Sequence, residues 1–119
     1  MTKRIVSPRI LAPILLLAAA IIIASPRLHA NADQPPAPVA DVKIDNFAFG
    51  PQFLTVKVGT TVTWTNRDDI PHTVVSSDGV FKSKARDTDE TFSYKFDKAG
   101  TYTYFCSLHP KMTGQVVVQ

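Results

Sequence analysis

The stretch Gly100-Thr-Tyr-Thr-Tyr-Phe-Cys-Ser-Leu-His-Pro-Lys-Met-Thr-Gly-Gln-Val-Val-Val118 decides the fold of this chain. Its first part alternates in type, so that Tyr102, Tyr104 and Cys106 share one face of a predicted strand. A short loop follows, and Gly114 turns the chain into a final run of three valines. The pattern therefore predicts two β-strands joined by a loop that begins at a cysteine.

The same period of two recurs upstream, with turn-forming residues between the alternating runs. No window of helical length has a convincing period of 3.6 residues. Seven or eight short strands in a chain of this length predict an all-β fold, a Greek-key two-sheet β-sandwich. The predicted strands are marked by Val42 and Ile44; Leu54, Val56 and Val58; Val62 and Trp64; Thr73-Val74-Val75; and Phe92, Tyr94 and Phe96.

The loop after Cys106 carries two further metal-binding side chains, His109 and Met112, and His72 lies 34 residues upstream of the cysteine. Two imidazoles and a thiolate with a weak axial thioether are the ligand set of blue-copper electron-transfer sites. Beyond position 32 the chain has no other Cys, His or Met. The sequence therefore predicts one copper ion, held by these four residues, that cycles between Cu(I) and Cu(II).

Each of these residues also has a simpler interpretation when it is taken alone. A single His is usually a surface or core residue, a lone Cys a small buried hydrophobe, and a lone Met a filler of core gaps. Zinc also binds Cys and His, but structural zinc sites rarely include Met. The spacing Cys-x-x-His-x-x-Met after a strand is far more specific than its members, so it favours copper.

Two other functions remain as alternatives to electron transfer. A periplasmic copper chaperone or scavenger would favour exposed, Met- and His-rich ligands, whereas this chain has one closed set. An enzyme could use Cys106 as nucleophile and His109 as base. Nothing in the sequence resembles a nucleophile elbow, and the domain is too small for a deep substrate pocket, so we expect no enzymatic activity.

The first 32 residues have the three parts of a secretory signal peptide. Lys3, Arg4 and Arg9 form a positive n-region, and an uncharged run follows from Ile10 to Ala24. Ala30-Asn31-Ala32 supplies the small residues expected before cleavage after Ala32. The alternative is a membrane anchor, although a spanning helix needs about 20 apolar residues and this run is shorter. We therefore expect export to the periplasm.

The remaining chain divides into a Pro-rich linker at 33–40 and one folded domain at 41–119. The signal segment holds four of the 13 basic residues and none of the 10 acidic ones. Its removal leaves a net charge of −1, so the basic composition does not indicate nucleic-acid binding. The single cysteine excludes an internal disulfide, and we expect it to be buried or bound to metal.

These motifs resemble those of the cupredoxins, the blue type 1 copper proteins, and most closely the amicyanin-like members. The stretch 100–118 is similar to their copper loop and final strand, and Thr61-Val-Thr-Trp-Thr-Asn-Arg-Asp-Asp-Ile-Pro-His72 to their first-histidine segment. The resemblance covers the domain from about Asp41. It implies one-electron transfer in the periplasm, with a quinoprotein amine dehydrogenase and a c-type cytochrome as partners. We expect a monomer without a membrane span in its mature form.

Two positions depart from the cupredoxin pattern. Many cupredoxins have Asn after the first histidine, where this chain has Thr73, whose hydroxyl cannot donate two hydrogen bonds. Amicyanin-like loops commonly have Pro two residues after the Cys, where Leu108 here restores an N–H. We expect the N–H groups of Leu108 and Thr73 to donate to the Cys106 sulfur. Both departures bear on the reduction potential rather than on copper binding.

Overall fold

The structure, a computed structural model, describes residues 8, 10, 12–15, 17–26 and 35–119. The chain divides into two units, Met1–Asp33 and Gln34–Gln119. None of the described residues lies in a helix with the length and apolar composition that a membrane crossing requires. The predicted charged n-region and the predicted cleavage site after Ala32 lie outside the described residues.

Eight strands build the unit Gln34–Gln119. They are β1 (Val39–Asp45), β2 (Ala48–Gly50), β3 (Phe53–Val56), β4 (Thr60–Asn66), β5 (Val75–Ser76), β6 (Thr91–Phe96), β7 (Gly100–Phe105) and β8 (Thr113–Val118).

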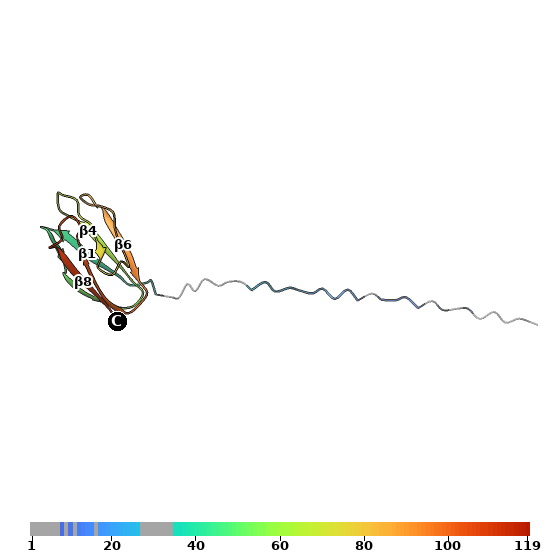
Figure 1. Cartoon of the computed structure of the whole chain (residues 1–119). Coiled ribbons are helices and arrows are strands. Elements are labelled where there is room, and N and C mark those ends of the chain that lie inside the picture. The colour runs from blue at the N-terminus through green and yellow to red at the C-terminus, as the bar shows by residue number, and fades with distance from the viewer. Residues whose placement is uncertain (1–7, 9, 11, 16, 27–34) are drawn as a thin grey trace, which may run out of the picture. The chain divides into compact units, whose positions relative to one another are not determined.

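The strands form two four-stranded sheets, with the orders β2-β1-β4-β6 and β3-β8-β7-β5. Figure 1 labels β1, β4 and β6 of the first sheet and β8 of the second. β1 pairs with β4 and β3 with β8 in parallel, while the other neighbours are antiparallel. The chain changes sheet between β2 and β3, between β3 and β4, and again at each of the next three connections. The predicted all-β two-sheet sandwich is therefore confirmed.

Aromatic side chains from both sheets meet in the core of this sandwich. Trp64 on β4 is 1% exposed, and its ring packs edge-on against Tyr104 of β7, with ring centroids 5.4 Å apart. Tyr104 in turn packs against Phe49 of β2 at 4.7 Å. Aromatic rings bury a large apolar area, so these contacts hold the two sheets together. The predicted alternation along β4 and β7 is thus seen as alternating burial.

The observed strands differ from the predicted ones in four places. Val58 was predicted to share a strand with Leu54 and Val56, but β3 ends at Val56 and Val58 is 45% exposed in the turn that follows. The predicted strand at 73–75 is wrong in its bounds, because β5 covers only Val75–Ser76. The N–H of Thr73 bonds instead to the Cys106 sulfur and that of Val74 to Ser83 Oγ, so neither donates to a neighbouring strand. The short strand β2 was not predicted, since its three residues are too few to show an alternating pattern. β1 begins at Val39, two residues before Asp41.

Candidate metal centre

The loop between β7 and β8 is closed by three backbone hydrogen bonds. The His109 N–H donates to the Cys106 carbonyl at 3.2 Å, and the Met112 N–H donates to the His109 carbonyl at 2.9 Å. The Cys106 N–H donates to the Met112 carbonyl at 3.1 Å, which joins the two ends of the loop. The spacing of two residues between ligands thus forms successive tight turns, and the paired strands on either side fix the position of the loop.

His72 reaches the same place from the segment that follows β4. Asn66, which is fully buried, accepts a hydrogen bond from the Asp68 N–H and donates to the carbonyls of Ile70 and Arg86. The His72 N–H then pairs with the Arg86 carbonyl at 3.1 Å. Because buried polar groups must find partners, Asn66 restricts the path of this segment and thereby sets the position of His72.

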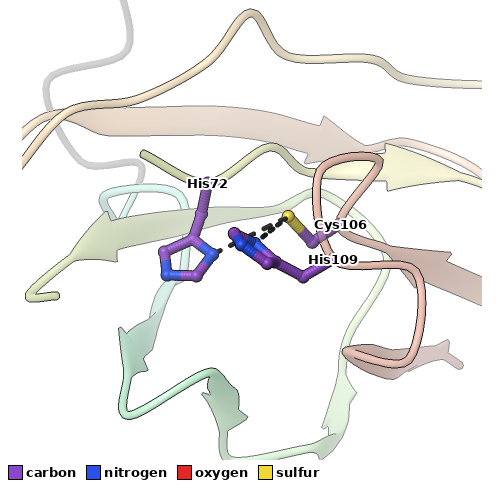
Figure 2. A group of neighbouring side chains, drawn as sticks. All are labelled: His72, Cys106 and His109. Carbon is purple, nitrogen blue, oxygen red and sulfur yellow. Dashed lines mark hydrogen bonds between the residues drawn. The ribbon is translucent and has the colours of Figure 1, made fainter. Parts of the chain in front are cut away.

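Three of the four predicted ligands are brought together. One ring nitrogen each of His72 and His109 and the sulfur of Cys106 lie within 4.8 Å of one another. Figure 2 shows both imidazole rings turned toward the sulfur, at Nδ1–Sγ distances of 3.7 Å for His72 and 3.6 Å for His109. Two atoms bound to one ion at about 2.0–2.3 Å in a trigonal plane lie roughly 3.7 Å apart. The spacing and chemistry of these donors therefore fit a copper ion.

Met112, the fourth predicted ligand, is buried beside this cluster, with 6% of its surface exposed. It lines the same open pocket as His109 and Phe47. Its backbone groups are bonded to Cys106 and His109, so that its side chain starts from a fixed point in the loop.

The two histidines differ in their exposure to solvent. His72 and Cys106 have no exposed surface, whereas His109 is partly exposed. The sulfur and the His109 ring also have the spacing of a nucleophile and its base, but a sulfur without exposed surface cannot reach a substrate. The arrangement suits a metal ligand that is shielded from solvent, and it argues against nucleophilic catalysis.

Hydrogen bonds prepare the cysteine for metal binding. Burial alone would raise the pKa of the Cys106 thiol. The Thr73 N–H, the rings of His72 and His109 and the Thr73 hydroxyl outweigh this effect and lower the pKa to about 6. A thiol with this pKa is largely a thiolate at neutral pH. The thiolate is the form of cysteine that binds metal.

Asp68 is the partner that orients His72. Its Oδ2 lies 2.7 Å from His72 Nε2, and the same carboxylate accepts the N–H groups of Asn46 at 2.6 Å and Phe47 at 3.0 Å. A carboxylate on Nε2 keeps that nitrogen as the donor to Asp68 and directs Nδ1 toward the Cys106 sulfur, where a metal would bind. Burial raises the pKa of Asp68, but the N–H groups of Phe47 and Asn46 and the His72 ring more than offset it, so the pKa is lowered.

We expect Asp68→Asn to weaken Cu(II) binding by about 10–100-fold, as changes to groups that orient a metal ligand typically do. The amide keeps the shape of the side chain but removes the negative charge that makes the His72 imidazole a stronger ligand for the metal. Competition with a Cu(II) chelator measures the affinity, and the adjacent exposed Asp69→Asn is the matched control. Equal affinities of the two variants would contradict the role of Asp68.

The Asp68 carboxylate also makes the folding stability depend on pH. Because its pKa in the folded protein lies below the ordinary 3.8, the carboxylate contributes fully to stability above that value, and this contribution is lost as pH falls through the folded pKa.

Phe47 covers the two histidines from the outside. Its ring lies edge-on to His72 at 5.7 Å and to His109 at 5.2 Å, while 53% of the residue stays exposed. Asn46 and Phe47 both have a positive φ, a conformation that the Asp68 carboxylate stabilises through their N–H groups. Neither Asp68 nor Phe47 was predicted from the sequence to belong to the site. An acidic residue four positions before His72 was a signal for the first, but the position of Phe47 depends on the fold.

The two departures from the cupredoxin pattern have different outcomes. The Thr73 N–H donates to the Cys106 sulfur at 3.4 Å, as predicted. The prediction for Leu108 is wrong, because within residues 35–119 no hydrogen bond joins its N–H to the sulfur. Leu108 is the third residue of the turn closed by His109 N–H, and its side chain is 52% exposed. The Thr73 hydroxyl instead lies 3.7 Å from the sulfur as a second donor.

Comparisons with known proteins identify the family of this chain. The family profile described as "Copper binding proteins, plastocyanin/azurin family" matches residues 37–119. Amicyanin-alpha of Methylorubrum extorquens is 40% identical over 89 residues, which cover 71% of this chain and 75% of the relative. Amicyanin of Paracoccus versutus is 34% identical over 104 residues, covering 83% and 78%.

Solved structures give the same result. A purple cupredoxin from Nitrosopumilus maritimus superposes with a TM-score of 0.63 at 36% identity, over 67% of this chain and 99% of that protein. The Cu(I) form of an amicyanin variant superposes with a TM-score of 0.65 at 38% identity, over 74% and 88%. The profile match covers the whole sandwich and the loop from Cys106 to Met112, and from it we conclude that the chain belongs to the plastocyanin/azurin family of copper-binding proteins, the blue-copper cupredoxins.

Proposed function

We propose that His72, Cys106 and His109 bind one copper ion, with Met112 as the weak axial ligand, and that the chain carries single electrons between exported redox proteins. The observation that carries this proposal is the group of two imidazole nitrogens and one buried sulfur within 4.8 Å. Bound copper supplies the Cu(I)/Cu(II) couple. Family membership supports an electron carrier rather than an enzyme.

The contribution of the protein is to hold the ligand atoms in place in both oxidation states. His72 is fixed by Asp68 and by its backbone pairing with Arg86, and the loop from Cys106 to Met112 is fixed by its own turns. Ligands that do not move need little reorganisation when an electron arrives, which favours fast transfer. Well-fixed ligands, of which only His109 is partly exposed, also argue against a chaperone or scavenger, which must release its metal.

An apolar surface around His109 offers a route for the electron. Phe47 and Leu108 are exposed there, beside the partly exposed His109 ring. A small apolar patch suits the short-lived contacts of redox partners, which have small interfaces. We propose a c-type cytochrome as acceptor and a periplasmic dehydrogenase, such as a quinoprotein amine dehydrogenase, as donor. A pocket in this apolar surface is lined by Phe47, His109, Pro110, Lys111 and Met112. We propose that export uses the signal peptide predicted at 1–32.

The visible spectrum of the copper-loaded protein tests this function. We expect one copper per chain and an intense thiolate-to-copper band near the red end of the spectrum, which disappears on reduction. Stopped-flow mixing of the reduced protein with an oxidised c-type cytochrome should return the band as the cytochrome is reduced. A colourless or weakly coloured copper complex would contradict the blue-copper assignment, and absence of transfer to the cytochrome would contradict that partner.

A further inference from the structure

The hydroxyl of Thr73 lies between the Cys106 sulfur and the residue that follows it, Ser107. Thr73 Oγ1 accepts a hydrogen bond from the Ser107 N–H at 2.7 Å. The same oxygen lies 2.7 Å from the Ser107 hydroxyl and 3.7 Å from the Cys106 sulfur. Thr73 and Cys106 are buried, whereas Ser107 is exposed. Three polar contacts therefore converge on one hydroxyl oxygen beside the proposed copper.

The number of protons decides the direction of these bonds. A threonine hydroxyl has one proton to donate and two lone pairs that accept. The Ser107 N–H occupies one lone pair. If Thr73 gave its proton to the Ser107 oxygen, its contact with the sulfur would hold no proton. If Ser107 donates instead, both lone pairs are used and the single Thr73 proton points to the sulfur. Only this second arrangement satisfies all three contacts.

We propose that Ser107 and Thr73 form a hydrogen-bond relay to the Cys106 sulfur that raises the reduction potential of the bound copper. In this relay the Ser107 hydroxyl donates to Thr73, and the Thr73 hydroxyl donates to the sulfur. The relay rests on the proposed function, since it acts through the copper–thiolate bond. Thr73 and Ser107 are positioning residues, because neither is a proposed ligand.

The direction of the effect follows from the charge of the sulfur. Hydrogen bonds to a thiolate ligand withdraw electron density from it, which favours the reduced ion. The Thr73 N–H at 3.4 Å supplies one such bond and the hydroxyl a second, so a single residue acts on the sulfur twice. The Ser107 donation polarises the Thr73 hydroxyl and strengthens its bond to the sulfur, since linked hydrogen bonds are cooperative.

The first test is Thr73→Val in the copper-loaded protein, because valine keeps the shape and the N–H but removes the hydroxyl. We expect the blue band to remain and the preference for Cu(I) over Cu(II) to fall by about tenfold, which lowers the midpoint potential by ~59 mV for one electron. Thr73→Ser restores the hydroxyl and should return most of the shift. An unchanged potential in Thr73→Val with intact colour would overturn the relay.

The sign of the Ser107→Ala shift tests the direction of the relay, and this variant also serves if Thr73→Val does not fold. Loss of the Ser107 donation should weaken the Thr73–sulfur bond and lower the potential by less than Thr73→Val does. If Thr73 instead donates to Ser107, removal of that acceptor would free its proton for the sulfur and raise the potential. A rise in Ser107→Ala therefore overturns the proposal.

Deuterium exchange separates a hydrogen bond to sulfur from a merely structural contact. Resonance Raman spectra of the wild type in D₂O should show shifts of the copper–sulfur bands that are smaller in Thr73→Val and restored in Thr73→Ser. Equal shifts in all three proteins would overturn the relay while the proposed function stands. A wild-type protein without the blue band would instead contradict the proposed function itself, so the two failures are distinguishable.

Discussion

Cys106→Ser is expected to abolish the blue colour of the copper-loaded protein and to weaken copper binding by more than about 100-fold. Substitution of a residue that only supports a metal ligand typically costs about 10–100-fold in affinity, and loss of a ligand itself should cost more. The Cys106 thiol has a pKa of about 6 and supplies a thiolate at neutral pH, whereas a serine hydroxyl stays protonated there. Loss of the thiolate removes both the soft ligand that favours Cu(I) and the source of the intense absorption band.

Two measurements check this result, copper content after dialysis and the visible spectrum. His72→Ala should also lose copper, while Met112→Gln, at the weak axial position, should keep copper and the blue band and lower the potential. The metal-free Cys106→Ser protein should remain folded by circular dichroism, because a buried Cys packs like a small side chain that serine nearly matches in size. Full copper occupancy with unchanged colour would refute the ligand assignment.

Local sequence patterns were enough to predict the sandwich and the loop that carries three of the four proposed ligands. Period-two alternation depends on the backbone, so β4, β6, β7 and β8 could be predicted from their bulky residues. The spacing from Cys106 to Met112 reflects turns formed within one loop. Both features depend on residues that are close together in the sequence, so they could be predicted from the amino-acid sequence alone.

The surroundings of the metal site depend on contacts between distant segments and could not be predicted in the same way. Phe47 reaches His109 from 62 positions away in the sequence, through a turn held by Asp68. The second donor to the sulfur, besides the Thr73 N–H, was predicted to be the Leu108 N–H but is the Thr73 hydroxyl, 33 positions from Cys106. Such pairings follow from how the two sheets bring the segment after β4 to the β7–β8 loop. A periodic pattern carries no information about them.

Gly114→Ala is expected to be the most destabilising methyl addition in the domain. Gly114 on β8 pairs directly with Tyr104 on β7, and a Cβ there would overlap the Cζ and hydroxyl oxygen of that side chain and lie 2.8 Å from its Cε2. Tyr104 cannot move aside easily, because Trp64 and Phe49 pack edge-on against its ring and only 1% of it is exposed. Glycine therefore serves here to admit the tyrosine ring.

The expected loss of folding free energy is about 3 kcal/mol or more. Overpacking a core typically costs about 1–3 kcal/mol, and here the overlap forces buried side chains or strands to shift. For a domain of this size Tm should fall by roughly 4–8 °C for each kcal/mol. Thermal and urea unfolding of the metal-free protein measure the loss. Thr113→Ala, an exposed neighbour on the same strand, is the control and should change stability by less than about 0.5 kcal/mol.

A double-mutant cycle shows whether the Tyr104 ring is the cause. Gly114→Ala should cost little when it is added to Tyr104→Leu, because the shorter side chain leaves room for the new methyl group, and alanine also reduces the entropy of the unfolded chain. The cycle should therefore give a coupling energy close to the whole cost of Gly114→Ala in the wild type. If the substitution costs the same with tyrosine and with leucine at position 104, steric overlap does not explain the glycine, and the pairing of β7 with β8 must require it for another reason.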